Sequence, residues 1–300
     1  MRKKILLIAF FCISIATYAG EKKITTSDGV ELYVKVKGQG TPLLYIHGGP
    51  GSGSLWFEEF FGEFMEAHFT VVYLDQRGVG RSSSPKDGNY SMERMAQDFE
   101  EVRESLGFES WLTLGHSFGG ILQMGYIQRF PLANKGMIMV NCTLNLPESL
   151  HESWAPKALE FLGETYTKND SLPLPQLMNN LGSRLREKNI FWKMAYAHSE
   201  NELIMNKTYE AIPNFNYDFG NAALLLDEYW ENYKPSTSAV EQPVLFFYGT
   251  QDWMVGPEHY KGVEFPEAIL WPGEVGHLPF QEGKEDLMAS ILEYKRKYSL

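Results

Sequence analysis

Cysteine is scarce in this chain of 300 residues, which contains only Cys12 and Cys142. Residues 1–19 have the pattern of a secretory signal peptide: basic residues at 2–4, an apolar run from 5 to 16, and small residues before a cleavage point after Ala19. Cleavage there removes Cys12, so the mature chain cannot form an intrachain disulfide. We therefore expect a hydrophobic core to supply the stability, with Cys142 as a small buried side chain in it. An uncleaved N-terminal anchor is the alternative for this segment.

Long apolar runs and basic charge are also lacking. After the first segment no run is long enough to cross a bilayer. The formal net charge is -11, with 27 basic and 38 acidic residues, which disfavours nucleic acid and anionic membranes as partners. No His, Cys or carboxylate cluster has metal-ligand spacing, so neither a metal nor a cofactor is predicted. We expect a periplasmic or secreted protein without stable membrane association after signal removal, acting on a small peptide or another small acyl substrate.

Short apolar runs alternate with helical stretches in much of the chain. The alternating segment 30–36 predicts an antiparallel strand with one wetted face. The runs predict strands buried on both faces, as in a parallel sheet, and right-handed crossovers through helices. The fold class predicted is therefore α/β, a mostly parallel sheet flanked by helices. The predicted strands of this kind are 43–46, 69–74, 111–114, 136–140 and 244–248, and the predicted helices are 56–67, 92–106 (with Ser91 as N-cap) and 118–129.

The alternation stops after Cys142. Residues 143–238 are helix-like, rich in aromatic residues and interrupted by prolines. We expect 20–142 and 239–300 to form the core, and 143–238 to form a helical cap over the carboxyl ends of the strands. Five aromatic side chains of the cap either line a pocket or hold the cap together, since aromatic residues chiefly supply buried area. They are Trp154, Trp192, Phe215, Tyr217 and Trp230.

The residues at 115–119, Gly-His-Ser-Phe-Gly, follow an apolar strand directly. This G-x-S-x-G pattern predicts a sharp strand-to-helix turn that lifts the Ser117 hydroxyl out of the sheet. Glycines are needed because the backbone of the nucleophile is strained and its neighbours approach closely. A free hydroxyl is a weak nucleophile, so the turn requires a base and an oxyanion site.

Candidates for the base and its orienting acid lie downstream of Ser117, in the order acid and then histidine. Asp252 follows the strand 244–248, and His277 follows the segment 268–271. Both lie at carboxyl ends of strands, where open α/β sheets place active groups. We expect His277 to take the proton of Ser117 and Asp252 to fix the imidazole tautomer. His116 is expected to point away from the turn into packing.

An oxyanion site is predicted from the residues at 47–51, His-Gly-Gly-Pro-Gly, which follow another strand. The backbone N–H groups of Gly49 and Phe118 are its expected donors. The segment 75–82 follows the strand that ends at residue 74. We expect Asp75 and Arg77 to form a buried pair that braces the oxyanion loop.

Together these segments resemble the α/β-hydrolase fold, and more narrowly the prolyl iminopeptidase-like family of serine peptidases. The resemblance rests on HGGPG at 47–51, on DQRGVGRS at 75–82, and on the serine turn with its late Asp252 and His277. It spans the chain from about residue 24 to the end. It implies release of an N-terminal residue, often proline, from small peptides.

The chain departs from the family where the substrate amine is recognised. Family aminopeptidases hold the free α-amino group with acidic side chains in or near the cap. Some members have a glutamate directly after the triad aspartate, where this chain has Trp253, and segment 213–216 lacks an acid. An esterase, lactonase or amidase acting on substrates without a free amine is therefore the alternative, and a non-catalytic binding protein is a third. Trp253 itself is a candidate for substrate binding. The acids that could substitute are Glu200, Glu202, Asp218, Asp227 and Glu228.

Overall fold

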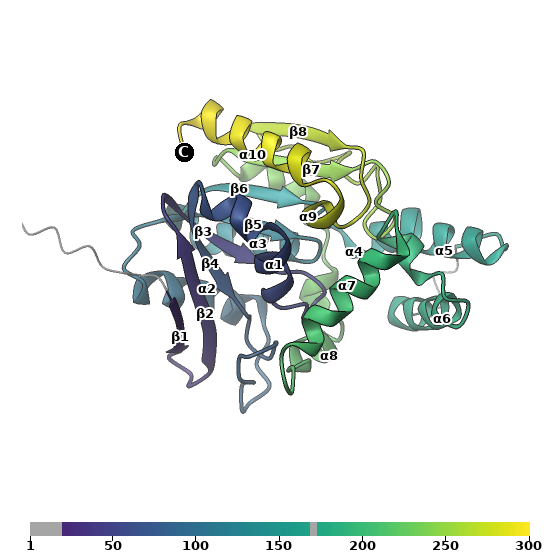
Figure 1. The fold of residues 1–300 in the computed structure, drawn as a ribbon, viewed down its shortest axis with the longest axis horizontal. Coiled ribbons are helices and arrows are strands. Elements are labelled where there is room, and N and C mark those ends of the chain that lie inside the picture. The colour runs from purple at the N-terminus through teal and green to yellow at the C-terminus, as the bar shows by residue number, and fades with distance from the viewer. Residues whose placement is uncertain (1–19, 169–172) are drawn as a thin grey trace, which may run out of the picture.

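The computed structural model of the protein describes residues 20–168 and 173–300, which form an eight-stranded sheet flanked by helices (Figure 1). The predicted signal peptide, residues 1–19, lies outside the described residues. The strand order is β1-β2-β4-β3-β5-β6-β7-β8. The strands are β1 Gly20–Thr25, β2 Glu31–Gly38, β3 Thr41–Ile46, β4 Phe69–Leu74, β5 Trp111–His116, β6 Asn134–Val140, β7 Val244–Gly249 and β8 Ala268–Gly273.

The mostly parallel α/β sheet predicted from the sequence is confirmed. Strand β2 is antiparallel to both of its neighbours, and all pairs from β4 to β8 are parallel. Strand β1 was not predicted, because it contains Glu21, Lys22 and Lys23 and buries only Ile24. A strand at the edge of a sheet needs few apolar residues, so it leaves little pattern in the sequence.

Helices cover both faces of the sheet. Helices α2 and α3 pack in one buried cluster, which includes Phe99 and Leu122, while α1 and α10 pack in another, which includes Phe61 and Ile291. Helix α2 begins where predicted, because the side chain of Ser91 accepts a hydrogen bond from Arg94 N. The bounds of these helices are α1 Leu55–Glu66, α2 Met92–Ser105, α3 Gly119–Arg129, α9 Pro279–Glu282 and α10 Lys284–Tyr298.

The described residues of segment 143–238, which we call the cap, form helices and turns between β6 and β7. The cap has a buried cluster of its own, including Trp154, Leu181 and Leu185. In Figure 1, α5 and α6 lie to one side of the sheet, and α7 lies nearer to α1 and α9. The bounds are α4 Leu146–Glu148, α5 Ala155–Leu162, α6 Leu174–Glu187, α7 Ser199–Glu210 and α8 Asp218–Ala223, with a π-helical turn at Ser149–Trp154 and 3-10 turns at Phe191–Met194, Asp227–Trp230 and Lys234–Ala239.

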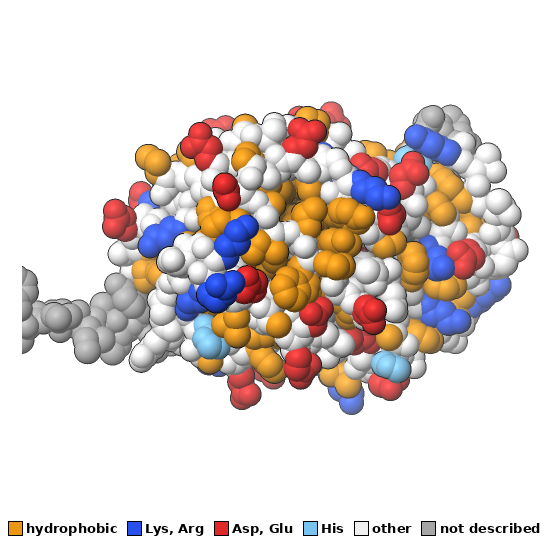
Figure 2. All heavy atoms as spheres, turned by 90° about the horizontal axis from the view of Figure 1, so that it is seen from above, with side chains coloured by type: hydrophobic (Ala, Val, Ile, Leu, Met, Phe, Trp, Pro, Cys, Tyr) orange, Lys and Arg blue, Asp and Glu red, His pale blue; other side chains and the backbone are white. Residues whose placement is uncertain are grey.

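No helix within the described ranges is both long and apolar enough to span a bilayer. On the face over α10 and β8, acidic and basic side chains are interspersed, with hydrophobic side chains between them (Figure 2). This face therefore presents no continuous basic area for a nucleic acid backbone.

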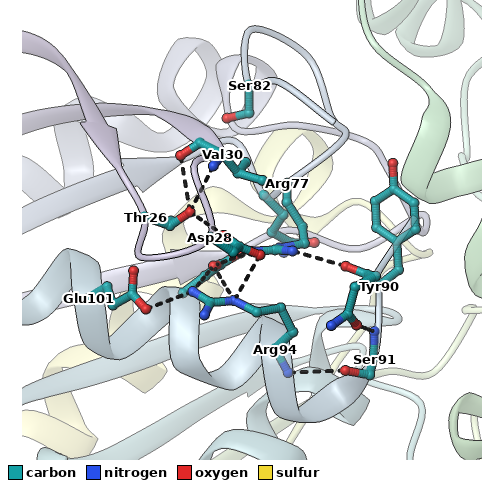
Figure 3. A network of polar contacts seen from close by, with 12 residues as sticks. Thr26, Asp28, Val30, Arg77, Ser82, Tyr90, Ser91, Arg94 and Glu101 are labelled. Atoms are coloured by element: carbon teal, nitrogen blue, oxygen red, sulfur yellow. Dashed lines mark hydrogen bonds and ion pairs between the residues drawn. The ribbon is translucent and has the colours of Figure 1, made fainter. Parts of the chain in front are cut away.

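A buried ion-pair network replaces the pair expected between Asp75 and Arg77 (Figure 3). Arg77, which is 0% exposed, donates from Nε to Asp98 Oδ2 at 2.6 Å, and its Nη2 lies 2.9 Å from Asp28 Oδ2. Asp75 pairs instead with Arg81, whose Nε lies 2.7 Å from Asp75 Oδ2. The expectation was wrong because Gly78 and Gly80 have positive φ and turn the chain, which brings Arg81 back to Asp75.

The substitution Arg77→Met is expected to lower the free energy of unfolding by about 3 kcal/mol, because it leaves Asp98 buried with one partner fewer. Urea denaturation measures the change. The control is Arg296→Met, because Arg296 pairs with Glu293 on the surface with 73% of its side chain exposed. Equal urea midpoints for the two variants would contradict a stabilising role of the buried network.

Candidate active site

Ser117 lies at the turn between β5 and α3 and has a φ of 55°, which is unusual for a residue other than glycine. Its backbone is held on both sides: Ser117 N donates to Val140 O, and Ser117 O accepts from Thr143 N at 3.1 Å. Gly119, two residues after the serine, has no room for a side chain, because a Cβ would lie 2.3 Å from Ile46 O. The turn thus presents the serine side chain at the carboxyl end of β5.

His277 and Asp252 form a hydrogen-bonded pair beyond the ends of β8 and β7. His277 Nδ1 lies 2.9 Å from Asp252 Oδ2, and both side chains are buried. The other carboxylate oxygen of Asp252 accepts backbone hydrogen bonds from Met254 and Val255 at 2.9 and 3.1 Å. Because Nδ1 is used by Asp252, Nε2 is the imidazole nitrogen left for a proton from serine.

Ser117 and His277 both line one cavity of about 250 Å³, between the core and the cap. Ser117 Oγ has no hydrogen-bond partner among the described side chains. A nucleophile–base hydrogen bond is often long before substrate binds and shortens in the reacting complex. The structure therefore brings Ser117, His277 and Asp252, which the sequence singled out, to one end of the sheet, with His277 and Asp252 hydrogen-bonded.

His116 supports the loop that carries His277. Its Nε2 lies 2.9 Å from His277 O, and its ring packs edge-on against Trp56 and Phe280. Burial, together with the nearby His277, holds the pKa of His116 well below its ordinary value. A neutral imidazole can donate from Nε2 to this carbonyl, so His116 can hold the backbone of His277 in place.

The loop of residues 47–51 lies directly against the serine turn. A Cβ on Gly48 would lie 2.8 Å from Ser117 Cβ and 3.2 Å from Phe118 N. Within the described parts of the chain, the N–H groups of Gly49 and Phe118 donate no hydrogen bond to another residue. Two free donors beside a serine can stabilise a developing oxyanion, which typically accounts for about 3 kcal/mol per donor.

Asp75 joins this loop to the segment after β4. Its Oδ1 accepts from both the backbone N and the Oγ of Ser54, at 2.9 and 2.7 Å, while its Oδ2 accepts from Arg81. Asp75 is fully buried, and hydrogen bonding to Arg81 and Ser54 outweighs burial and holds its pKa below the ordinary value. Asp75 therefore does form a buried ion pair next to the oxyanion loop, but its partner is Arg81 and not Arg77.

Glu202 is the one predicted amine-binding candidate that lines the cavity with Ser117. It lies on α7 and forms no ion pair or hydrogen bond with any described residue. Burial raises the pKa of its carboxyl group, and Arg186 offsets part of this effect. Phe191, Tyr196, Met205, Asn206 and Tyr209 also line the cavity. None of these was predicted, because no local motif marks them and the folding of the cap alone brings them to Ser117.

The other candidates lie elsewhere. Trp253 lines a second cavity of about 460 Å³, and Lys157 Nζ lies 4.3 Å from the centre of its ring. Asp218 accepts a hydrogen bond from Ser84 Oγ, and Glu228 accepts one from Met92 N. Glu200 is exposed on α7, and neither it nor Asp227 lines the cavity with Ser117.

Metal ligation is not evident at the site. The described residues contain no group of His, Cys, Asp and Glu side chains arranged to hold a metal ion. The chemistry that these residues themselves offer is nucleophilic attack with proton transfer through an imidazole.

Several bacterial and archaeal proteins are similar to this chain in sequence. It is 39% identical to the proline iminopeptidase of Neisseria gonorrhoeae over 102 residues, which are 33% of this chain and 32% of that protein. The chain thus spans about a third of the length of that relative. It is 32% identical to the proline iminopeptidase of Saccharolobus solfataricus over 144 residues, 46% of this chain and 45% of the other. An AB hydrolase superfamily protein of Bacillus subtilis is 24% identical over 285 residues, 90% of this chain and 97% of that protein.

Solved structures share the fold. A proline iminopeptidase-related protein from Thermus thermophilus superposes with a TM-score of 0.76 at 23% identity, covering 92% of this chain and 98% of the other. An esterase from Thermogutta terrifontis superposes with a TM-score of 0.69 at 23% identity, covering 93% and 99%. A sequence profile of the alpha/beta hydrolase fold matches residues 41–283. The chain therefore belongs to the α/β-hydrolase fold family.

Proposed function

We propose that this protein is a serine hydrolase acting through Ser117, His277 and Asp252, and that it is an aminopeptidase releasing proline or another small residue from the N-terminus of peptides. The hydrogen-bonded His277–Asp252 pair and the cavity shared by His277 and Ser117 support the hydrolase. The similarity to proline iminopeptidases supports the aminopeptidase. A periplasmic or secreted location is part of the proposal and rests on the sequence of residues 1–19.

In the proposed reaction, Ser117 Oγ attacks the substrate carbonyl carbon and gives its proton to His277 Nε2. The carbonyl oxygen becomes an oxyanion that accepts hydrogen bonds from Gly49 N and Phe118 N. His277 then protonates the leaving amine as the C–N bond breaks, which leaves an acyl ester on Ser117. Water, deprotonated by His277, attacks this ester and releases the free acid.

The observation that carries the aminopeptidase proposal is the position of Glu202. Its carboxylate lines the same cavity as the nucleophile and has no partner among the described residues. A half-buried, unpaired carboxylate gains free energy when it pairs with a substrate ammonium group. The cavity of about 250 Å³ has aromatic walls, including Trp56, Phe191 and Tyr209, which suit one small apolar residue beside that charge.

A matched pair of proline arylamides, one with a free amine and one N-acetylated, tests this proposal. We expect the free-amine compound to have a kcat/KM higher by roughly 100-fold, because acetylation removes the charge that pairs with Glu202. Release of the arylamine measures both rates. Equal turnover of the two compounds would refute the aminopeptidase and leave the hydrolase standing.

An esterase, lactonase or amidase acting on substrates without a free amine is the second candidate. The observation that favours it is the aromatic and aliphatic wall of the cavity, which offers Glu202 as its one acidic side chain. Burial raises the pKa of that carboxyl group, which favours its neutral form. Faster turnover of the N-acetylated compound would support this candidate.

A further inference from the structure

The loop that carries Gly49 packs against the cap as well as against the serine turn. A Cβ on Gly51 would lie 3.2 Å from the N and Cα atoms of Gly220 in α8, and a Cβ on Gly220 would lie 3.0 Å from Pro50 O. A Cβ on Gly53 would meet the ring of Phe215 at 3.2 Å. The oxyanion loop is therefore enclosed, with Ser117 and Phe118 on one side and residues 215–220 of the cap on the other.

This part of the cap is itself fastened to the core. Asn216 and Gly80 exchange two backbone hydrogen bonds, of 2.9 and 3.0 Å, and Phe219 N donates to Gly78 O. The Asn216 side chain donates to Ser82 O and Ser84 Oγ and accepts from Asp218 N. Residues 215–220 are thus hydrogen-bonded to residues 78–84, in the segment that follows β4.

Asp75 closes the connection between that segment and the oxyanion loop. It accepts from Ser54, which lies three residues after the loop at the start of α1, and from Arg81 beside Gly80. A Cβ on Gly80 would lie 2.6 Å from Asp75 Oδ2, so the backbone that pairs with Asn216 also touches the carboxylate. Asp75 therefore holds the chain just after the oxyanion loop, and the cap contacts the loop at Pro50 and Gly51.

We propose that residues 215–220 of the cap position the backbone N–H of Gly49, and that Gly220 and Asn216 are positioning residues for the oxyanion site. This inference rests on the proposed acyl transfer at Ser117. It gives the cap a part in stabilising the transition state in addition to enclosing the substrate. Neither residue is in the lining of the cavity with Ser117, so neither is expected to contact the substrate's acyl group.

The physical argument depends on how closely an oxyanion donor must be placed. Donors act at about 2.7–3.1 Å from the oxyanion, and small misplacements in an active site are costly to the rate. A methyl group on Gly220 must push Pro50 O by a few tenths of an ångström or shift α8. Pro50 O belongs to the peptide unit between Pro50 and Gly51, so the push must pass back through Pro50 to reach Gly49 N in the same short loop.

The substitution Gly220→Ala tests the inference, with Gly182→Ala in α6 as its matched control. Both glycines lie in cap helices, but a Cβ on Gly182 would approach the end of the flexible Arg186 side chain at 3.1 Å and touch the Phe191 ring at an ordinary contact distance of 3.8 Å, with no backbone atom as close. We expect Gly220→Ala to lower both kcat and the rate at which a fluorophosphonate labels Ser117 by about 10-fold, with KM within about 2-fold of the wild type. Alanine favours a helix over glycine, so a lower Tm is not expected.

A second pair of variants covers the case in which Gly220→Ala lowers Tm. Asn216→Ala removes the side-chain hydrogen bonds to Ser82 and Ser84, while Asn145→Ala removes comparable bonds to Glu148 elsewhere in the cap. We expect only Asn216→Ala to slow labelling of Ser117. Labelling by Gly220→Ala and Asn216→Ala at the rates of their controls would overturn the inference. Failure of the wild type to be labelled at all would instead refute the proposed hydrolase.

Discussion

Ser117→Ala is expected to lower kcat for proline arylamide by about 10⁴-fold or more, because it removes the atom that forms the acyl ester. The folded state should keep its stability. Ser117 Oγ has no hydrogen-bond partner among the described residues, so its removal leaves no buried group unpaired. Alanine also has the same backbone preferences as serine to a first approximation, and the positive φ at this position remains. Arylamine release and a thermal melt measure the two effects.

The control for this variant is Ser238→Ala. Ser238 is exposed, donates to Pro235 O and does not line the cavity with Ser117. The Ser238→Ala protein should keep the wild-type kcat. This result would show that replacing a serine elsewhere in the chain does not lower activity. Cys142 cannot take over the reaction, because burial raises the pKa of its thiol and keeps it protonated. Wild-type turnover in the purified Ser117→Ala protein would therefore refute the proposed mechanism.

The sheet could be predicted because its strands are buried on both faces. The run 69–74 coincides with β4, and the run 111–114 lies within β5. Such a strand can be recognised from its own residues alone, since it must be apolar along its length to fit between two layers of helices. Asp252 and His277 could be found for a related reason: each follows a strand, and all parallel strands end at the same edge of the sheet.

The contacts between loops could not be predicted in the same way. Asp75 pairs with Arg81 instead of Arg77 because two glycines with positive φ turn the chain between them, and nothing in the order of the residues fixes that turn. Arg77 forms its ion pair with Asp98 on α2, a residue that only the fold brings next to it. The same holds for Glu202: five acids were equivalent candidates until the path of α7 placed one of them beside Ser117.

Glu202→Gln is expected to lower kcat/KM for the free-amine arylamide by roughly 100-fold, because the amide keeps the shape of the side chain and loses the charge that pairs with ammonium. Hydrolysis of the N-acetylated compound should change little. Glu200→Gln is the matched control, since Glu200 lies on the same helix and is exposed outside the cavity. A loss of equal size toward both arylamides would indicate a damaged site instead of a lost amine contact.

The pH dependence of the wild type provides an independent check on Glu202. In the proposed complex the ionised carboxylate of Glu202 binds the amine. Burial raises the pKa of this carboxyl group, so its charge is lost at a higher pH than for an exposed glutamate. As pH falls through that raised pKa, the preference for the free-amine compound over the acetylated one should decline toward the ratio shown by Glu202→Gln. Taking the ratio of two substrates cancels the effect of pH on the catalytic steps that both reactions share. A ratio that stays constant in the wild type down to the titration range of exposed carboxylates would mean that another group binds the amine.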